Sequence, residues 1–139
     1  TLVRVEWSEH RERLKPKIDD IGNKANDPEL YTYIDKACSN EWAFLFLAPD
    51  GFVVLRPRHQ RTIDFIELLV AYCAGGNAFQ KYLSNLLFLA QLGKATHLQF
   101  LTVRKGLNKV APKYGWRLFG MHRNKYIWRI DIKGARHGW

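Results

Sequence analysis

The residues with the clearest chemical potential form a glycine turn between two apolar segments. Gly75 and Gly76 follow an apolar run that begins at Phe65 and has the composition of a strand, and apolar residues at helical spacing then continue to Leu92. A turn of this kind leaves the first N–H groups of the helix unpaired, and the helix dipole favours an anion beside them. The segment therefore predicts a phosphate site. A plain strand-to-helix turn is the alternative, because glycines are common at such turns.

Cys73 lies just before this turn, near the predicted helix start, where a thiolate is favoured. No histidine lies near it in the sequence to act as its partner, so we interpret Cys73 as a small packing residue. The five histidines show no ligand spacing with one another or with the two cysteines, which predicts no structural metal. Cys38 and Cys73 cannot build a disulfide framework, which fits a reducing compartment.

The positive charge of the chain is concentrated in its second half. Residues 1–72 carry 10 Lys and Arg against 12 Asp and Glu, a balance of −2, whereas residues 73–139 carry 12 against 1, a balance of +11. Because Asp131 is the only acid there, these cations must face solvent or an anionic ligand. A nucleotide cofactor, a nucleic acid, an acidic protein surface and a simple solvated face are all compatible with this charge.

Aromatic and basic residues alternate in the last third of the chain. A surface that stacks bases and pairs phosphates has this mixture, and so does a half-buried antiparallel hairpin. Strand periodicity already accounts for the aromatic residues, so we favour core packing over nucleic-acid binding. The residues concerned are Trp116, Phe119, Tyr126 and Trp128, interspersed with Arg117, Arg123, Lys125 and Arg129.

Length and composition favour one domain. At 139 residues with 47% hydrophobic content, the chain suits a single core over residues 1–132, followed by a tail at 133–139. It has no apolar run long enough to cross a bilayer, and residues 1–17 are too charged for a secretory signal. We therefore expect a soluble, cytoplasmic protein.

The first third of the chain has the pattern of a strand and two helices. An alternating strand over 2–7 leads to a helix capped by Ser8, which Pro16 breaks or kinks. The residues at 27–29 (DPE) supply a cap, a proline and an acid that open a second helix, which ends at 39–40.

The remaining elements surround the glycine turn. Strands at 42–47 and 52–55 flank a hairpin turn at 48–51, and residues 56–61 are predicted to form a basic loop before the central strand. After the helix that follows the turn, the patterns predict strands at 97–103, 116–122 and 126–132, a short helix at 104–113 and a tight turn at 123–125.

The resulting order, β-α-α-β-β-β-α-β-α-β-β with a glycine turn after the central strand, resembles the GCN5-related N-acetyltransferase (GNAT) superfamily. The resemblance covers nearly the whole chain by element order and is sharpest from Phe65 to Phe119. It implies an α/β (α+β) fold with a mixed, mostly antiparallel sheet of about six to seven strands, flanked by about four helices.

The first motif of the resemblance is the cofactor turn. In the family, a strand is followed by Gln/Arg-x-x-Gly-x-Gly/Ala, whose backbone N–H groups hold the pyrophosphate of acetyl-CoA. Residues 73–78 (CAGGNA) match at Gly76 and Ala78 and depart at Cys73, where the long polar side chain is missing. The turn still offers backbone donors and little side-chain bulk. The cofactor-binding residues that the resemblance implies are Leu69, Val70, Ala71, Tyr72, Gly75, Gly76, Asn77, Ala78 and Arg104.

The second motif precedes the penultimate strand, where family members read Asn-x-x-Ala-x-x-x-Tyr-x-x-x-Gly-Phe. With Gly115 at the glycine, Arg104 stands at the asparagine and Leu107 at the alanine. Ala111 then stands at the tyrosine that commonly protonates the departing thiolate of CoA. Tyr114 comes three residues later and points elsewhere on a helix, so we interpret it as a packing residue.

The resemblance also implies a base, because family members often use a carboxylate of the central strand to deprotonate the amine. Asp64 and Glu67 are the only acids between Gly51 and the glycine turn, and they are the candidate catalytic residues. If Glu67 is buried among its apolar neighbours, its pKa rises, which suits a general base. A solvated acid on an exposed strand face is the alternative for both.

Three functions follow from these patterns. The first is an N-acetyltransferase that takes acetyl-CoA as donor, uses no metal and acts on an amine of a small molecule or a protein. The second is a catalytically degenerate GNAT-like protein, similar to those encoded by tailed bacteriophages, which binds phage structural proteins in the host cytoplasm or the virion. The third is a basic module that binds nucleic acid.

Overall fold

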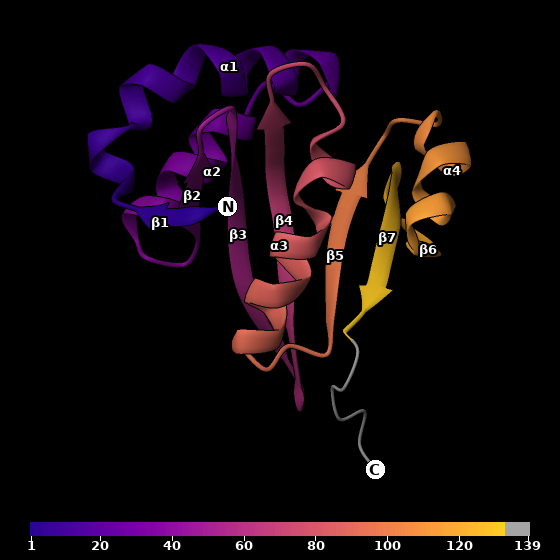
Figure 1. Ribbon diagram of the computed structural model, residues 1–139. Coiled ribbons are helices and arrows are strands. Elements are labelled where there is room, and N and C mark those ends of the chain that lie inside the picture. The colour runs from indigo at the N-terminus through magenta and orange to yellow at the C-terminus, as the bar shows by residue number, and fades with distance from the viewer. Residues whose placement is uncertain (133–139) are drawn as a thin grey trace.

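A seven-stranded sheet with the order β1-β2-β3-β4-β5-β7-β6 runs through the molecule (Figure 1). The computed structural model describes residues 1–132. Neighbouring strands are antiparallel except β4 and β5, which are parallel. The strands are β1 (Val3–Val5), β2 (Phe44–Ala48), β3 (Gly51–Gln60), β4 (Ile63–Cys73), β5 (His97–Thr102), β6 (Arg117–His122) and β7 (Lys125–Asp131).

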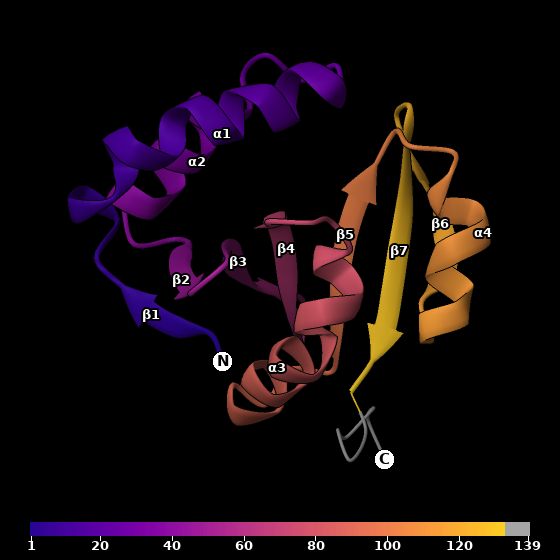
Figure 2. The same cartoon turned by 45° about the horizontal axis from the view of Figure 1, so that its top comes forward.

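Helices cover both faces of this sheet (Figures 1 and 2). Two of them, α1 and α2, bury residues such as Ile18 and Ile34 against one face of β2, β3 and β4. The opposite face packs on α3, where Leu86 joins a core with Leu98 and Trp128. The helices are α1 (Arg11–Lys24), α2 (Leu30–Ser39), α3 (Ala78–Leu92) and α4 (Leu107–Val110), with 3-10 turns at Trp7–Glu9 and Ala111–Tyr114.

The parallel strands β4 and β5 pair over only part of their length. Their register consists of Ile66 opposite Leu98 and Glu67 opposite Gln99. Beyond these pairs β4 continues to Cys73 and β5 continues to Thr102. The sheet is therefore open between the ends of its two central strands.

A β-bulge in β4 lies next to this opening. Val54 is opposite Val70, whereas the next residue of β3, Leu55, is opposite Leu68. Leu69 is therefore the extra residue, and a bulge of this kind bends its strand and increases the local twist. Leu69 lies two residues beyond Glu67, the last residue of β4 that pairs with β5.

The predicted fold class and order of elements are confirmed, but the loop predicted at 56–61 is wrong. β3 continues to Gln60 in a long ladder with β4, in which Arg56 is opposite Glu67. Pro57 fits in this strand because β2 pairs with β3 only as far as Leu55. One edge of β3 is therefore unpaired at Pro57, and prolines in sheets are found at such edges.

The predicted start of the first helix is also wrong. Ser8 lies in a 3-10 turn, and α1 begins at Arg11 without a side-chain cap. Pro16 lies inside α1 without ending it. Pro16 and Glu12, whose carbonyl loses its helical donor, are both exposed, so water can satisfy that carbonyl.

Smaller differences concern two later helices. The second helix begins at Leu30, one residue after the segment predicted to open it. The helix predicted at 104–113 is split into α4 and the 3-10 turn that contains Pro112. The predicted tail at 133–139 lies outside the described residues.

Candidate functional site

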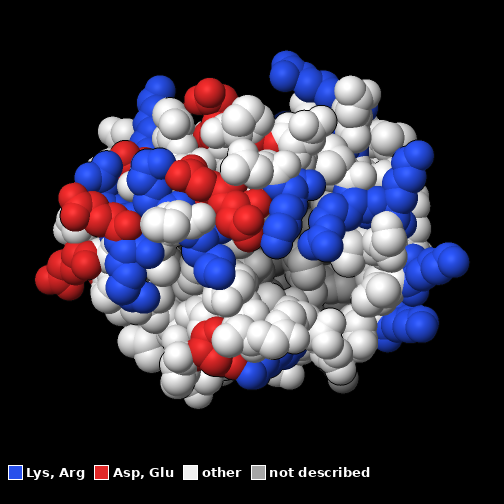
Figure 3. Space-filling view, turned by 90° about the horizontal axis from the view of Figure 1, so that it is seen from above, with Lys and Arg blue, Asp and Glu red and all other residues white. Residues whose placement is uncertain are grey.

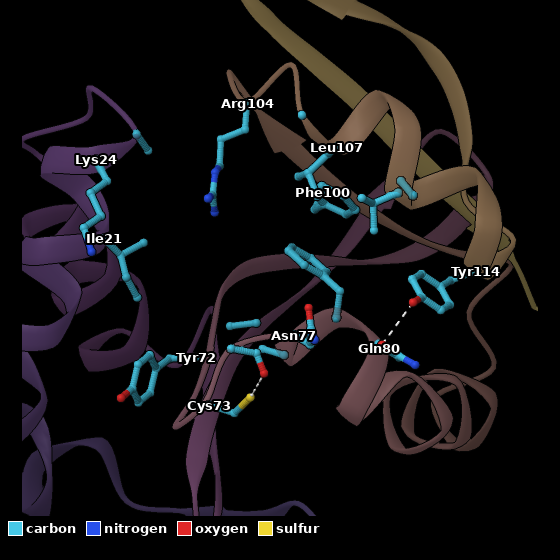
Figure 4. Close-up of a pocket in the computed structure, with 18 of the residues that line it drawn as sticks. Ile21, Lys24, Tyr72, Cys73, Asn77, Gln80, Phe100, Arg104, Leu107 and Tyr114 are labelled. Carbon is cyan, nitrogen blue, oxygen red and sulfur yellow. Dashed lines mark hydrogen bonds between the residues drawn. The ribbon is translucent and has the colours of Figure 1, made fainter.

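A cleft with a volume of about 790 Å³ lies where β4 and β5 separate (Figure 4). Its walls come from α1, the end of β4, the start of α3, β5 and the α4 segment. In Figure 3, basic side chains flank a hollow on the corresponding end of the molecule. The cleft therefore joins the predicted phosphate turn to a basic surface.

The glycine turn has an unusual backbone. Gly75, Gly76 and Asn77 have φ values of 90°, 83° and 63°, all in the left-handed region. Glycine adopts this region without strain, and asparagine tolerates it better than most residues. A Cβ atom at either glycine would meet no atom within 4 Å, so the surface of the turn is open.

Cys73 stabilises this turn through hydrogen bonds on its buried side. Its thiol donates a 2.7 Å hydrogen bond to the Gly76 carbonyl, and the Gly76 N–H donates to the Cys73 carbonyl at 3.1 Å. Cys73 is buried, as expected for a packing residue. The departure from the family motif at this position therefore replaces a long polar side chain with a small internal hydrogen-bond donor.

The start of α3 offers backbone donors to the cleft. The first hydrogen bond of the helix runs from the Lys81 N–H to the Asn77 carbonyl at 2.9 Å. The N–H groups of Ala78, Phe79 and Gln80 precede it and so have no acceptor within the helix. All three residues line the cleft. Together with the helix dipole, these N–H groups make this end of α3 suited to an anion.

The hairpin between β2 and β3 anchors the other side of the turn. The Asp50 carbonyl accepts a 2.7 Å hydrogen bond from the Ala74 N–H. The Asp50 carboxylate accepts a hydrogen bond from Tyr82 at 2.7 Å and forms an ion pair with Lys81, both in α3. These hydrogen bonds lower the pKa of Asp50, with the bond from Lys81 as the larger cause. The hairpin thus links the glycine turn to the helix that follows it.

Substitution of Gly51 in this hairpin is expected to destabilise the protein. A Cβ atom there would lie 2.0 Å from the Tyr72 carbonyl oxygen and 2.7 Å from the Cys73 Cα atom, and neither backbone atom can move freely. Gly51→Ala should lower the free energy of unfolding by about 1–3 kcal/mol. Denaturant unfolding monitored by circular dichroism measures the change.

Gly106→Ala is the matched control for this prediction. At Gly106 a Cβ atom meets nothing within 4 Å, and the backbone has a helical φ of −59°. Alanine there should leave stability unchanged or raise it by about 0.4–1 kcal/mol. Equal destabilisation by the two substitutions would contradict the close packing of the hairpin against β4.

Three cations stand around the cleft. Lys17 places its ammonium 4.5 Å from the centre of the Tyr72 ring, and Lys24 pairs with Asp20 at 3.1 Å. Arg104 lies on the wall opposite α1 (Figure 4), and its side chain forms no ion pair with the described residues. These charges suit a ligand that carries phosphates.

Aromatic rings form the apolar side of the cleft. Phe79 and Phe100 have ring centroids 4.5 Å apart, and Trp116 meets Phe100 edge-on at 4.8 Å. Ala111 is buried beside them, with 4% of its surface exposed. At the position of the family tyrosine, this side chain has no proton to donate.

Tyr114 has a larger part in the cleft than predicted. It packs against the core as expected, but it also lines the cleft and donates a 3.0 Å hydrogen bond to the Gln80 side chain (Figure 4). Tyr114 thereby joins the end of the 3-10 turn to the first turn of α3. The sequence pattern missed this residue, and it missed Lys17 and Lys24, because their elements are distant in the chain.

The predicted cofactor-binding residues divide into two groups. Leu69 and Val70 do not line the cleft but pack toward the core beneath α1 and α2, because the bulge turns both toward that side. Arg104 and the segment from the end of β4 to the start of α3 meet at the cleft. The lining residues from the predicted set are Ala71, Tyr72, Gly75, Gly76, Asn77, Ala78 and Arg104.

The two predicted catalytic acids lie outside the cleft lining, and in different places. Glu67 forms the last β4 and β5 pair before the opening, and its side chain is 14% exposed and 2.9 Å from the Arg58 guanidinium. Asp64 lies near the other end of β4, about 30 Å from Cys73 along the strand. Its side chain is 62% exposed and 2.5 Å from His59. Only Glu67 is near the opening.

Residues 1–132 contain neither a cluster of metal-binding side chains nor a helix that could span a membrane. No group of three or more His, Cys, Asp or Glu side chains in that range is arranged to hold a metal ion. None of the helices described is long and apolar enough to cross a membrane.

Comparisons with known proteins bear on the fold. No sequence-family model matches this chain, and no curated protein matches it in sequence. A solved structure from Desulfovibrio desulfuricans, assigned to the GNAT acetyltransferase family, superposes with a TM-score of 0.69 at 11% identity, covering 95% of this chain and 98% of that one.

Two further solved structures superpose on this chain to a similar extent. An acetyltransferase from Streptococcus agalactiae has a TM-score of 0.65 at 13% identity and covers 94% of this chain and 98% of its own. The aminoglycoside 6'-N-acetyltransferase from Enterococcus faecium has a TM-score of 0.65 at 10% identity, covering 98% and 99%. The chain therefore has the fold of the GNAT acetyltransferases over nearly its full length.

Proposed function

We propose that this protein, which has the GNAT fold, transfers an acetyl group from acetyl-CoA to an amine. One observation supports the proposal: the glycine turn and the start of α3 open onto the gap between β4 and β5. The turn presents the free N–H groups of Ala78, Phe79 and Gln80, and cations stand around it. These features suit a thioester that carries a pyrophosphate.

Different residues of the cleft would bind different parts of acetyl-CoA. Backbone donors at the start of α3, with Arg104 and Lys24, would hold the phosphates. The apolar wall formed by Phe100 and Leu107 would pack against the uncharged arm of the donor. The reacting carbonyl would then lie in the gap, within reach of an acceptor that approaches from the other face of the sheet.

The reaction requires the loss of two protons from the nitrogen of the ammonium form and one bond exchange. The amine nitrogen attacks the thioester carbonyl carbon after Glu67, directly or through a water molecule, accepts a proton from the ammonium form. The carbon–nitrogen bond forms, the carbon–sulfur bond breaks, and the sulfur leaves as the CoA thiolate. The nitrogen then loses its second proton to water and becomes the amide. Ala111 cannot protonate that thiolate, so water supplies the proton. A thiol has a pKa of about 8.5, which makes the thiolate a tolerable leaving group near neutral pH.

Acetyl-CoA is expected to raise the melting temperature of the protein. A ligand that binds only the folded state at 100 times its Kd adds about 2.7 kcal/mol to the free energy of unfolding, which corresponds to roughly 8 °C or more for a domain of this size. Differential scanning fluorimetry measures the shift. Adenosine at the same concentration is the control and should have little effect, because it lacks the phosphates. Unchanged melting at millimolar acetyl-CoA would refute the proposal.

A second function is a GNAT-fold protein that binds acetyl-CoA without transferring the acetyl group. Ala111 favours it, because the side chain at this position has no proton for the leaving thiolate. The two functions differ in thiol release. With a panel of amines, the enzyme releases free CoA faster than the amines do alone, whereas the inactive binder shows only the thermal shift.

A further inference from the structure

A row of polar residues crosses the sheet on the face opposite α3. Directly opposed residues on neighbouring strands project from the same face. The registers place five such residues in line across β3, β4, β5, β7 and β6. They are Arg56, Glu67, Gln99, Arg129 and Arg117.

In Figure 2, α1 and α2 lie toward the half of the sheet formed by β1 to β4, whereas β5, β7 and β6 form the right-hand half. Leu98 and Trp128, which alternate with the row, are buried on the α3 side. The core under α1 and α2 includes residues of β2, β3 and β4, but its described members include none from β5, β6 or β7. Gln99 and Arg129 are therefore held by the sheet itself and not by a helix packed over them.

Two cations of this row, Arg56 and Arg129, form no ion pair with a carboxylate in residues 1–132, but Arg56 donates a hydrogen bond to the Tyr33 hydroxyl. Among the described residues, Arg58 pairs with Glu67 at 2.9 Å and Arg117 pairs with Asp131 at 2.7 Å, but no carboxylate lies within 4.0 Å of Arg129. Its polar contact to Gln99 is long, at 3.5 Å. Its Nε–H group is buried and has no hydrogen-bond partner in residues 1–132.

The guanidinium of Arg129 is nevertheless well placed. The Phe119 ring lies 3.6 Å from its Cζ atom, which fixes the plane of the group by a cation–π contact. Burial lowers the pKa of Arg129, because removal from water penalises its charge. A fixed, partly desolvated guanidinium that forms no ion pair within residues 1–132 is suited to a planar anion, which it can bind through two parallel hydrogen bonds.

We propose that Arg129 binds a carboxylate of the acceptor, and that the acceptor is therefore an amine that also carries a carboxylate. The inference rests on the proposed acetyl transfer, since it places the amine at Glu67. Two strand spacings separate Glu67 from Arg129, or about 10 Å between their backbones. An ω-amino acid spans such a distance, with its amine at the opening between β4 and β5.

The test uses the Arg129 Nε–H group as a direct probe. Its resonance in ¹⁵N spectra is identified as the arginine signal that Arg129→Lys removes. We expect this resonance to shift when 4-aminobutanoate or 6-aminohexanoate is added, and to stay in place when the corresponding amides are added. Lysine keeps the charge but loses the forked geometry, so Arg129→Lys should bind the amino acids about tenfold more weakly.

Arg13→Lys is the matched control, because Arg13 is exposed on α1 and away from the sheet. It should retain the wild-type binding. An Arg129 resonance that no ω-amino acid moves would overturn the inference, and so would equal shifts with acids and amides. A shift with O-phosphoethanolamine alone would replace the carboxylate by a phosphate and overturn the assignment.

The outcome is separable from that of the proposed function. The acetyl-CoA thermal shift depends on the cleft and not on Arg129. If acetyl-CoA stabilises the protein while the Arg129 resonance stays fixed, the carboxylate inference fails alone. If the resonance responds but acetyl-CoA has no effect, the anion site stands and the acetyltransferase proposal fails.

Discussion

Asn77→Asp is expected to weaken acetyl-CoA binding by about tenfold or more, because it places a negative charge in the turn that would hold the pyrophosphate. The substitution preserves shape, and aspartate tolerates the left-handed conformation of Asn77 (φ 63°). Aspartate also favours the residue before a helix as much as asparagine does. The protein without ligand should therefore melt no lower than the wild type. Calorimetric titration with acetyl-CoA measures the loss of affinity.

The control for this prediction is Asn77→Gly. Glycine accepts a positive φ without strain and introduces no charge, so its affinity for acetyl-CoA should remain close to that of the wild type. The difference between the two variants should shrink at high salt, because salt screens the repulsion at this exposed turn. If the two variants bind equally well at low salt, the phosphates do not lie at the start of α3.

Glu67→Gln is expected to lower kcat by about 10²–10⁴-fold, the usual contribution of a general base. The amide has the same shape and can still accept a hydrogen bond from Arg58, so the fold and donor binding should be preserved. The acetyl-CoA thermal shift should therefore match that of the wild type. The rate of CoA release should recover toward high pH, where the amine loses its proton without help. A fixed loss at every pH would indicate that Glu67 has only a structural role.

Asp64→Asn is the matched control. Asp64 lies on the same strand and also pairs with a basic side chain, but it is near the strand end remote from the opening. An odd separation of three residues also puts it on the opposite face of the sheet from Glu67. Its replacement should change kcat by less than about twofold, because surface substitutions of this kind have small effects. A loss equal to that of Glu67→Gln would mean that neither acid is the base.

Local signals explain what could be predicted at the site. Gly75 and Gly76 break the apolar pattern between a strand and a helix, and such punctuation depends on neighbours in the sequence. The turn at residues 48–51 was predicted for the same reason, through Pro49 and Gly51. The prediction of a loop at 56–61 is wrong because Pro57 favours a loop locally, whereas the ladder with β4 favours a strand.

The positions of the two candidate catalytic acids could not be predicted from the sequence. Asp64 and Glu67 are three residues apart and look equivalent in the sequence. The structure separates them because β4 pairs with β5 at Glu67 and opens beyond it. Burial and partners then differ for the two side chains, and neither can be read from composition.

The sequence by itself determined the order of the elements and the phosphate turn, because periodicity and glycine placement act within a few residues. The tertiary structure alone decided how far β4 and β5 remain paired and which face Leu69 and Val70 occupy. It also decided that Lys17 and Lys24 of α1 face the cleft and that Arg129 lacks a carboxylate partner in the described chain. These features depend on strand register and on a single bulge, and both are set by contacts between residues far apart in the chain.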